Sequence, residues 1–126
     1  MNEIVAIIRP KKVTATKEAL ESLGFPSMTA ISVLGRGKQK GIAAELGIDV
    51  RPEIIEQGKT AGRKYMEYIP KRLLFIAACE EDTDIIVKTI IRVNQSGQIG
   101  DGKIFVCPIE DAITVRTDEQ GDKAIK

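Results

Sequence analysis

Apolar and polar positions alternate along the chain with two periods, one typical of strands and one of helices. Residues 4–8 form a short apolar run that ends at Pro10, which is typical of a buried strand. In residues 12–23 apolar side chains return at helical spacing between a proline and a glycine, so a helix is predicted. Residues 28–34 alternate and are rich in β-branched side chains, which predicts a second strand.

The second half of the chain repeats this succession. Residues 73–78 are predicted to be a strand that is apolar on both faces, and Asp82 is predicted to cap a helix whose apolar stripe runs through residues 86–94. Residues 103–106 are predicted to be a fourth strand and residues 112–116 a short fifth one. The order predicts an α+β fold, a ferredoxin-like βαββαβ sandwich with both helices on one sheet face, in a single domain spanning residues 1–126.

Between the second and third strands lies a stretch without a sustained pattern, from residue 35 to about residue 68. Loops longer than about 12–15 residues are uncommon in a compact domain and tend to be functional or disordered. Two fragments, residues 43–46 and 52–57, carry the punctuation of short helices, and the apolar residues around them are unsuited to permanent solvation. We therefore predict a segment that folds when a partner docks on it.

Composition excludes several classes of function. The chain has 126 residues and a net charge of +1, which argues against a partner held by bulk charge, such as duplex DNA. It contains no histidine, so His-dependent nucleophile pairs and imidazole metal ligands are excluded. Two cysteines are too few for a structural zinc site, and 4% aromatic residues argue against a base-stacking RNA platform.

The length of the apolar runs bears on where the protein works. No run approaches the roughly eighteen residues of a membrane span, and the N-terminus lacks the regions of a signal peptide. We expect a cytoplasmic protein that neither inserts into a membrane nor binds nucleic acid.

Two glycine-bracketed basic stretches are candidates for binding phosphate. They are Gly-Arg-Gly-Lys-Gln-Lys-Gly at residues 35–41 and Gly-Asp-Gly-Lys at residues 100–103. Glycines let a backbone approach a phosphate, while lysine and arginine neutralise its charge; the alternatives are a solvated hairpin shoulder and an ordinary turn. Residues 97–103 also match the spacing of an NTPase phosphate loop, but Ile104 replaces the required Ser or Thr, and a strand follows where a helix is needed.

Residues 96–106, Ser-Gly-Gln-Ile-Gly-Asp-Gly-Lys-Ile-Phe-Val, resemble the C-terminal signature of P-II nitrogen regulatory proteins. Residues 35–41 resemble the start of the long T-loop of that family, and residues 69–71 resemble its end. The similarity runs from residue 4 to about residue 117 and places the T-loop at about residues 36–68. The resemblance implies a homotrimer with three clefts between subunits, each of which binds ATP or ADP.

The resemblance also implies roles for individual residues. Gln39 is expected to coordinate the Mg²⁺ ion held by ATP and 2-oxoglutarate, and Lys71 to pair with the 2-oxoglutarate carboxylate, with Lys40 and Gly41 beside that ligand. The chemistry is consistent, because a dianionic keto acid needs a cation and a metal ion can bridge it to phosphates. The residues expected to line the nucleotide are Thr29, Gly35, Gly37, Lys38, Ile99, Gly100, Gly102, Lys103 and Arg116.

The chain departs from the family pattern in three respects. Thr114 stands where a second arginine is common, and Asp118 replaces a customary glycine, which leaves the preference between ATP and ADP open. The loop is longer than usual, and the tyrosine that some relatives have uridylylated has no clear counterpart. Tyr65 falls one residue off when counted back from Pro70, so we expect no uridylylation there, and the sequence does not decide whether Tyr68 is modified.

The extended loop, its opening and the Cys-Pro-Ile-Glu ending at residues 107–110 resemble the nitrogenase-associated branch, in particular its second, longer-loop paralogue. The resemblance implies a regulator rather than an enzyme, which inhibits nitrogenase until 2-oxoglutarate releases it and which has a paralogous P-II subunit as a possible partner. One alternative is a regulator of another target, such as an ammonium channel, a transcription factor or a biosynthetic enzyme. A less favoured alternative is a slow nucleotide hydrolase in which Asp101 positions a water.

Overall fold

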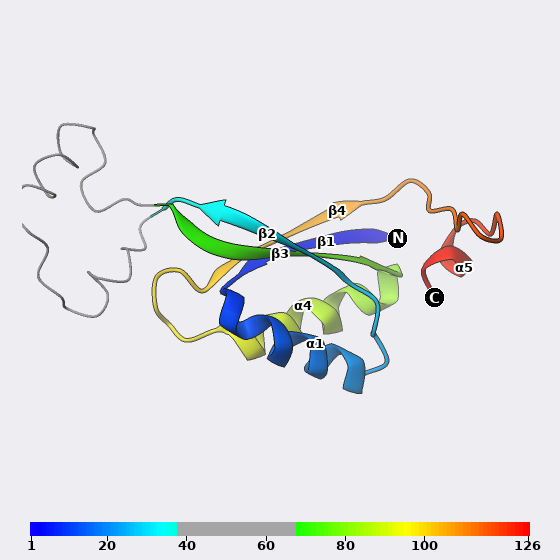
Figure 1. The fold of residues 1–126 in the computed structure, drawn as a ribbon. Coiled ribbons are helices and arrows are strands. Elements are labelled where there is room, and N and C mark those ends of the chain that lie inside the picture. The colour runs from blue at the N-terminus through cyan, green and yellow to red at the C-terminus, as the bar shows by residue number, and fades with distance from the viewer. Residues whose placement is uncertain (38–67) are drawn as a thin grey trace, which may run out of the picture.

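The computed structural model describes residues 1–37 and 68–126 (Figure 1). Its centre is a four-stranded antiparallel sheet in the order β2-β3-β1-β4. The strands are β1 (Asn2–Ile8), β2 (Thr29–Gly35), β3 (Ile69–Ala78) and β4 (Gly102–Pro108). The four strands predicted from the sequence are confirmed, and β3 and β4 are longer than their apolar runs.

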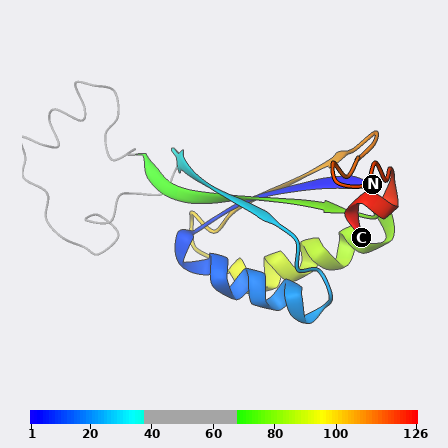
Figure 2. The ribbon, with the colours of Figure 1, turned by 45° about the vertical axis from the view of Figure 1, so that its right-hand side comes forward.

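Two helices cover one face of this sheet (Figures 1 and 2). Helix α1 (Val13–Ser22) follows a short 3₁₀ turn, η1 (Pro10–Lys12), and α4 (Glu80–Asn94) follows β3 directly. The proline opens η1 because its fixed φ suits the first turn of a helix, where its missing N–H costs nothing. The predicted βαββαβ order, with both helices on the same side, is confirmed.

The core lies between the sheet and the two helices. Ile4, Ala6 and Ile8 occupy alternate positions of β1, and the register places Ala6 between Leu74 of β3 and Ile104 of β4. Side chains that are paired in this way point to the same face, so the alternation buries one face of the sheet. The helices complete the core with Leu20 of α1 and with Ile86 and Ile90 of α4.

Asp82 is not the cap of α4, contrary to the prediction. The helix begins at Glu80, and Cys79 is its N-cap residue, without a capping hydrogen bond from its side chain. Because β3 extends to Ala78, the acidic run that follows forms the first turn, where negative charge interacts favourably with the helix dipole.

The predicted fifth strand at residues 112–116 is also wrong. The backbone N–H of Thr114 donates to the Glu119 carbonyl at 2.9 Å, and the N–H of Asp118 donates to the Thr114 carbonyl at 2.8 Å. The segment therefore folds back on itself, with an isolated bridge between Ile113 and Gln120, instead of adding to the sheet. Asp118 takes a left-handed φ of 61° at this turn.

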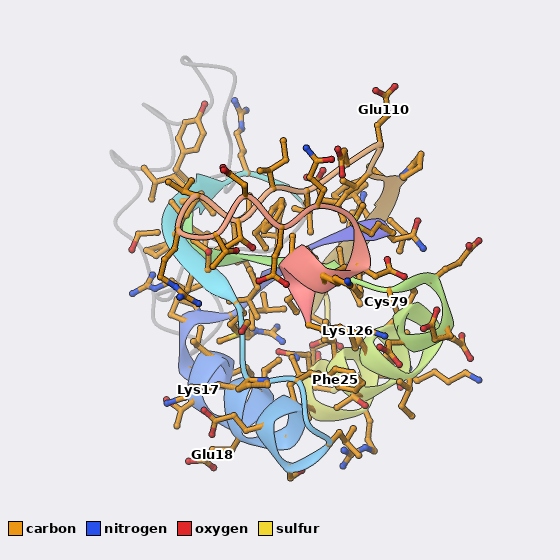
Figure 3. All side chains as sticks on the ribbon, turned by 90° about the vertical axis from the view of Figure 1, so that its right-hand side faces the viewer. Lys17, Glu18, Phe25, Cys79, Glu110 and Lys126 are labelled. Atoms are coloured by element: carbon orange, nitrogen blue, oxygen red, sulfur yellow. The ribbon has the colours of Figure 1, made fainter. Side chains whose placement is uncertain are left out.

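A short C-terminal helix that the sequence pattern did not predict, α5 (Asp122–Ile125), follows this turn. It lies beside the end of the sheet where β1 begins and β3 ends (Figure 2). Cys79 and Lys126 both line a cavity of about 360 Å³ there, and they lie close together in Figure 3. Burial raises the pKa of the Cys79 thiol, with a contribution from Asp122, so this thiol stays protonated.

Within residues 1–37 and 68–126 no helix is long and apolar enough to cross a membrane. The short helices predicted at residues 43–46 and 52–57 lie outside the described residues.

Candidate functional site

The second face of the sheet is apolar, and none of the helices in residues 1–37 and 68–126 covers it (Figure 1). The register places Ile31 opposite Leu73, Val5 opposite Phe75, and Phe105 opposite Val5, all on this face. Ile31 is 51% exposed and Phe105 is 49% exposed. We call this surface the open face; a patch of adjacent exposed apolar side chains is typical of a surface that binds a partner.

A cavity of about 570 Å³ lies on the open face, where β2 ends and β3 begins. This volume falls within the roughly 300–1,000 Å³ of small-molecule sites. The cavity brings together two stretches that are far apart in the sequence, the end of β2 and the turn before β4. Six of the nine residues predicted to line a nucleotide are found in its wall, namely Gly35, Gly37, Ile99, Gly100, Gly102 and Lys103.

Thr29 and Arg116 do not line this cavity. Thr29 pairs with Phe75, six positions along β2 from Gly35, which pairs with Ile69 at the cavity. Arg116 lies in the turn that follows β4. Strand β4 ends at Pro108, which pairs with Asn2 at the opposite end of the sheet from Gly102. The other predicted residues of the site, Lys38, Gln39, Lys40 and Gly41, lie outside the described residues.

The cavity is positively charged. Arg36, Lys71 and Lys103 all line it, and Arg36 is a member that the sequence analysis left out of the site. The wall between them is apolar, with Ile69 and Phe105, so the cations face a partly dry environment in which their charge is felt more strongly. The arrangement suits a ligand that combines an anionic group with an apolar or aromatic one.

Lys71 connects β3 to the turn before β4. Its side chain is buried, with 8% of the residue exposed, and its Nζ donates to the Gly100 carbonyl at 2.7 Å. Lys71 lines the cavity, and its ammonium group carries three donors.

Asp101 holds the turn together from inside. Its carboxylate accepts from the backbone N–H of Ser96 at 2.7 Å, from that of Gly97 at 3.0 Å, from the Ser96 hydroxyl and from Arg9. The hydrogen bonds from Ser96, together with those from Arg9 and Gly97, hold the pKa of the Asp101 carboxyl well below its usual range. Asp101 is therefore ionised and fully engaged in structure, as the turn-stabilising interpretation of the sequence requires.

Gly102 is needed for the packing of the strands. Its φ is +121°, and a Cβ built on it would lie 1.9 Å from the carbonyl oxygen of Ile7 in β1. Only glycine allows β4 to approach β1 this closely, and this approach carries Lys103 onto the open face beside Ile7.

Arg9 is the residue of this region that sequence reasoning missed. Its guanidinium pairs with Asp101, and its Nη2 donates to the Ile99 carbonyl at 2.9 Å. An arginine directly after an apolar run gives no local sign of a partner ninety residues away, so spacing alone could not have found it.

Gln39, the residue expected to hold a metal ion, lies outside the described residues. Among the residues that the structure describes, no group of three or more His, Cys, Asp or Glu side chains could hold a metal ion.

The chain was compared with protein-family models, curated proteins and solved structures. The family model "Nitrogen regulatory protein P-II" matches residues 1–119. The "Nitrogen fixation nifHD region glnB-like protein 2" of Methanococcus maripaludis is 56% identical over 126 residues, covering 99% of this chain and all of that protein. The corresponding nifHD1-region protein 2 of Methanosarcina barkeri is 50% identical, with both chains fully covered.

A relative that bears the number 1 in its name is less similar. The "nifHD region GlnB-like protein 1" of Methanothermobacter marburgensis is 42% identical, covering 96% of this chain and 99% of that protein. This difference agrees with the predicted similarity to the second paralogue. Among solved structures, Arabidopsis thaliana PII bound to citrate aligns with a TM-score of 0.72 at 28% identity, over 99% of this chain and 89% of that one. With the signature at residues 96–106 shaping the wall of the cavity, these matches show that the chain belongs to the P-II family of nitrogen regulatory proteins.

Proposed function

We propose that the protein reports nitrogen status by binding ATP or ADP, Mg²⁺ and 2-oxoglutarate, and that it thereby controls a target, nitrogenase, through residues 36–68. P-II proteins are signalling regulators that generally bind these nucleotides and 2-oxoglutarate. The observation that carries the proposal is the cavity, because its wall contains Gly35 and Gly37 of the first predicted phosphate stretch and residues 100, 102 and 103 of the second.

The turn before β4 is suited to phosphate. Gly100 and Gly102 have positive φ values of 100° and 121°, conformations in which successive backbone N–H groups can converge on an anion. Lys103 and Arg36 supply the positive charge. ATP or ADP would place its phosphates along this turn.

Lys71 is the residue that we assign to 2-oxoglutarate. It lines the same cavity as Lys103 and is mostly buried, so its ammonium group meets a ligand under weak solvent screening. Gln39 would hold the Mg²⁺ ion, whose chemistry is to join the keto acid to the phosphates of ATP. Lys40 and Gly41 would lie beside the keto acid.

The open face supports assembly into a homotrimer. Its apolar side chains are exposed in one subunit, and the cavity opens on the same face. Thr29 and Arg116, which are remote from the cavity of their own subunit, would then complete the site of a neighbouring copy. Since Asp118 and Thr114 lie close to Arg116 in the sequence, they would influence the choice between ATP and ADP from that neighbour.

The link from ligand to target follows from where the cavity lies. Gly37 and Ile69 line it, and these residues flank the stretch from 38 to 67 on either side. A ligand that contacts both flanks can favour one arrangement of the stretch over another, and it signals only by its differential affinity for the two. Nitrogenase is the favoured target because the relatives are named for the nifHD nitrogen-fixation region.

A hydrolase is disfavoured by the state of Asp101. Four hydrogen bonds occupy its carboxylate, and its pKa lies well below the usual range, so it is a poor general base. We expect only a slow release of phosphate; a turnover approaching one per second would favour the enzyme.

Calorimetry tests the ligand sites. Lys103→Met is expected to weaken ATP binding about tenfold or more, and Lys71→Met to remove 2-oxoglutarate binding in Mg-ATP while sparing ATP. Lys17→Met on α1 is the matched control, because it removes an exposed cation from the helix side. Absence of 2-oxoglutarate binding to the wild-type protein in Mg-ATP contradicts the proposal.

The target is tested with a deletion of residues 43–58. We expect the deleted protein to bind both ligands. In the absence of 2-oxoglutarate the wild-type protein should inhibit nitrogenase, and the deleted protein should not. Full inhibition by the deleted protein contradicts a role for this segment. Recovery of an ammonium channel in place of nitrogenase components from cells contradicts the nitrogenase assignment and favours the alternative target.

A further inference from the structure

We infer that Arg9 is a positioning residue of the nucleotide site, which fixes the turn at residues 96–102 in the conformation that faces the phosphates. It acts through Asp101 and the Ile99 carbonyl, without touching the ligand. This inference rests on the proposed nucleotide binding and extends it to a residue on a different strand end.

The geometry of Arg9 is that of a fork. One guanidinium nitrogen pairs with Asp101, and another donates to the Ile99 carbonyl at 2.9 Å. The side chain is only 16% exposed, and that of Asp101 is 22% exposed, so the pair is partly shielded from water and salt. A planar guanidinium presents two donors in a fixed fork that suits both acceptors, whereas a lysine at this position would lack this geometry.

The fork joins the turn to the sheet. Arg9 directly follows β1, while Asp101 binds the N–H groups of Ser96 and Gly97 at the start of the turn. One ion pair therefore connects β1 to both ends of the turn, with a second bond at its middle.

The turn needs such a connection because it is rich in glycine. Gly97, Gly100 and Gly102 all have positive φ, and glycine has the largest conformational freedom to lose. Ordering a loose turn at the moment of binding weakens affinity, whereas a turn that is already ordered avoids this cost. The same conformation presents the Gly100 carbonyl to Lys71, so the fork also supports the residue assigned to 2-oxoglutarate.

Direct contact between Arg9 and a phosphate is the competing explanation. Arg9 is not among the residues that line the 570 Å³ cavity, and its guanidinium is already engaged by Asp101 and Ile99. The two explanations differ in what should happen when Asp101 is neutralised: a positioning role predicts weaker binding, and a direct role predicts binding that is unchanged or stronger because Arg9 is released.

A double-mutant cycle on the full-length protein distinguishes them. We expect Arg9→Met and Asp101→Asn each to weaken ATP binding about tenfold in calorimetry, and the double variant to be no weaker than either single one. Arg9→Lys should recover part of the loss, to about threefold. Lys11→Met is the control, since its exposed side chain makes no hydrogen bond or ion pair within the described residues, and we expect a change of less than twofold.

Amide hydrogen exchange supplies the positional readout. Without nucleotide, residues 96–102 of Arg9→Met and Asp101→Asn should exchange at least tenfold faster than in the wild type, while residues 74–78 of β3 stay protected. If Arg9→Met does not fold, Arg9→Lys and Asp101→Asn carry the test.

Three outcomes overturn the inference. They are wild-type ATP affinity in Arg9→Met, additive losses in the double variant, and unchanged exchange of the turn in both single variants. If the wild-type protein binds no nucleotide, the proposed function fails, and the exchange measurement still decides whether Arg9 orders the turn.

Discussion

Both faces of the sheet carry apolar side chains, but these side chains have opposite environments. On the helix side Ile4, Ala6 and Leu74 are fully buried, whereas on the open face Ile31 and Phe105 are about half exposed. The open face ends in Lys71 and Lys103, which line one cavity with the exposed Phe105. Burial on the first face stabilises the fold, and the second face is the one to which we assign a ligand and a second copy of the chain.

The largest effect on stability is expected at Leu74, whose neighbour Leu73 points to the opposite face of the sheet. Leu74→Ala, at a residue with no exposed surface, is expected to cost about 2–5 kcal/mol in the free energy of unfolding. Leu73→Ala on the open face should cost about 1–2 kcal/mol in the separate subunit. Urea unfolding measures both losses. Equal losses at low protein concentration would contradict the difference in burial between the two faces.

Gly102→Ala is expected to have the next largest effect on stability, because β4 packs closely against β1 at this residue. The added Cβ would meet the Ile7 carbonyl at 1.9 Å, and the residue would keep an unfavourable φ, which together should cost about 2–4 kcal/mol. Gly24→Ala is the control, since Gly24 also has a positive φ but has no atom within 4 Å of the added Cβ. A loss at Gly102 no larger than at Gly24 would show that the contact with Ile7 is unimportant.

Phe105→Asp should break the open face without unfolding the subunit. A carboxylate on an apolar interface is costly to bury, so we expect self-association to weaken at least tenfold in analytical ultracentrifugation, with little change in helix content by circular dichroism. Ile91→Asp on α4 is the control, because Ile91 is exposed to a similar extent, 44% against 49%, on the helix side. Equal loss of association in the two variants would mean that the open face is not the interface.

The smallest effect on stability, and the only one that depends on pH, is expected for Asp101→Asn. The folded pKa of Asp101 is depressed, so its contribution to stability is fully present above the unfolded value of about 3.9 and is lost as the pH falls below it. The variant should be less stable than the wild type at pH 7, and this difference should shrink below about pH 4. Thermal unfolding across pH 2–7 measures it, and a constant difference would contradict the ionised state.

How far the sequence could predict the fold depended on whether a signal was local. The strands around Ile4 and Leu74 and the helix around Ile90 followed from periodicity, because burial on one face leaves a repeat in the chain itself. The strand predicted at residues 112–116 was wrong because β-branched side chains indicate a strand, whereas Thr114 donates to the Glu119 carbonyl and accepts from the Asp118 N–H, which turns the chain back. The prediction that Asp82 caps the helix was wrong, because an acidic residue suits the first turn of a helix as well as its cap.

The candidate site could likewise be predicted only where its features are local in the sequence. Glycines and lysines in two stretches marked phosphate chemistry, and the signature at residues 96–106 marked the family, which the family match confirmed. Neither Arg9 nor the convergence of the two stretches at one cavity is visible locally, since Arg9 and Asp101 are 92 positions apart.

By itself, the sequence determined the order of the elements, the family and the residue types available for a phosphate, because each is recorded in neighbouring positions. The tertiary structure alone decided which face of the sheet stays open, that Lys71 reaches the Gly100 carbonyl, and that Gly102 is needed against Ile7. These features depend on the antiparallel register, which brings distant segments together and has no counterpart in local spacing.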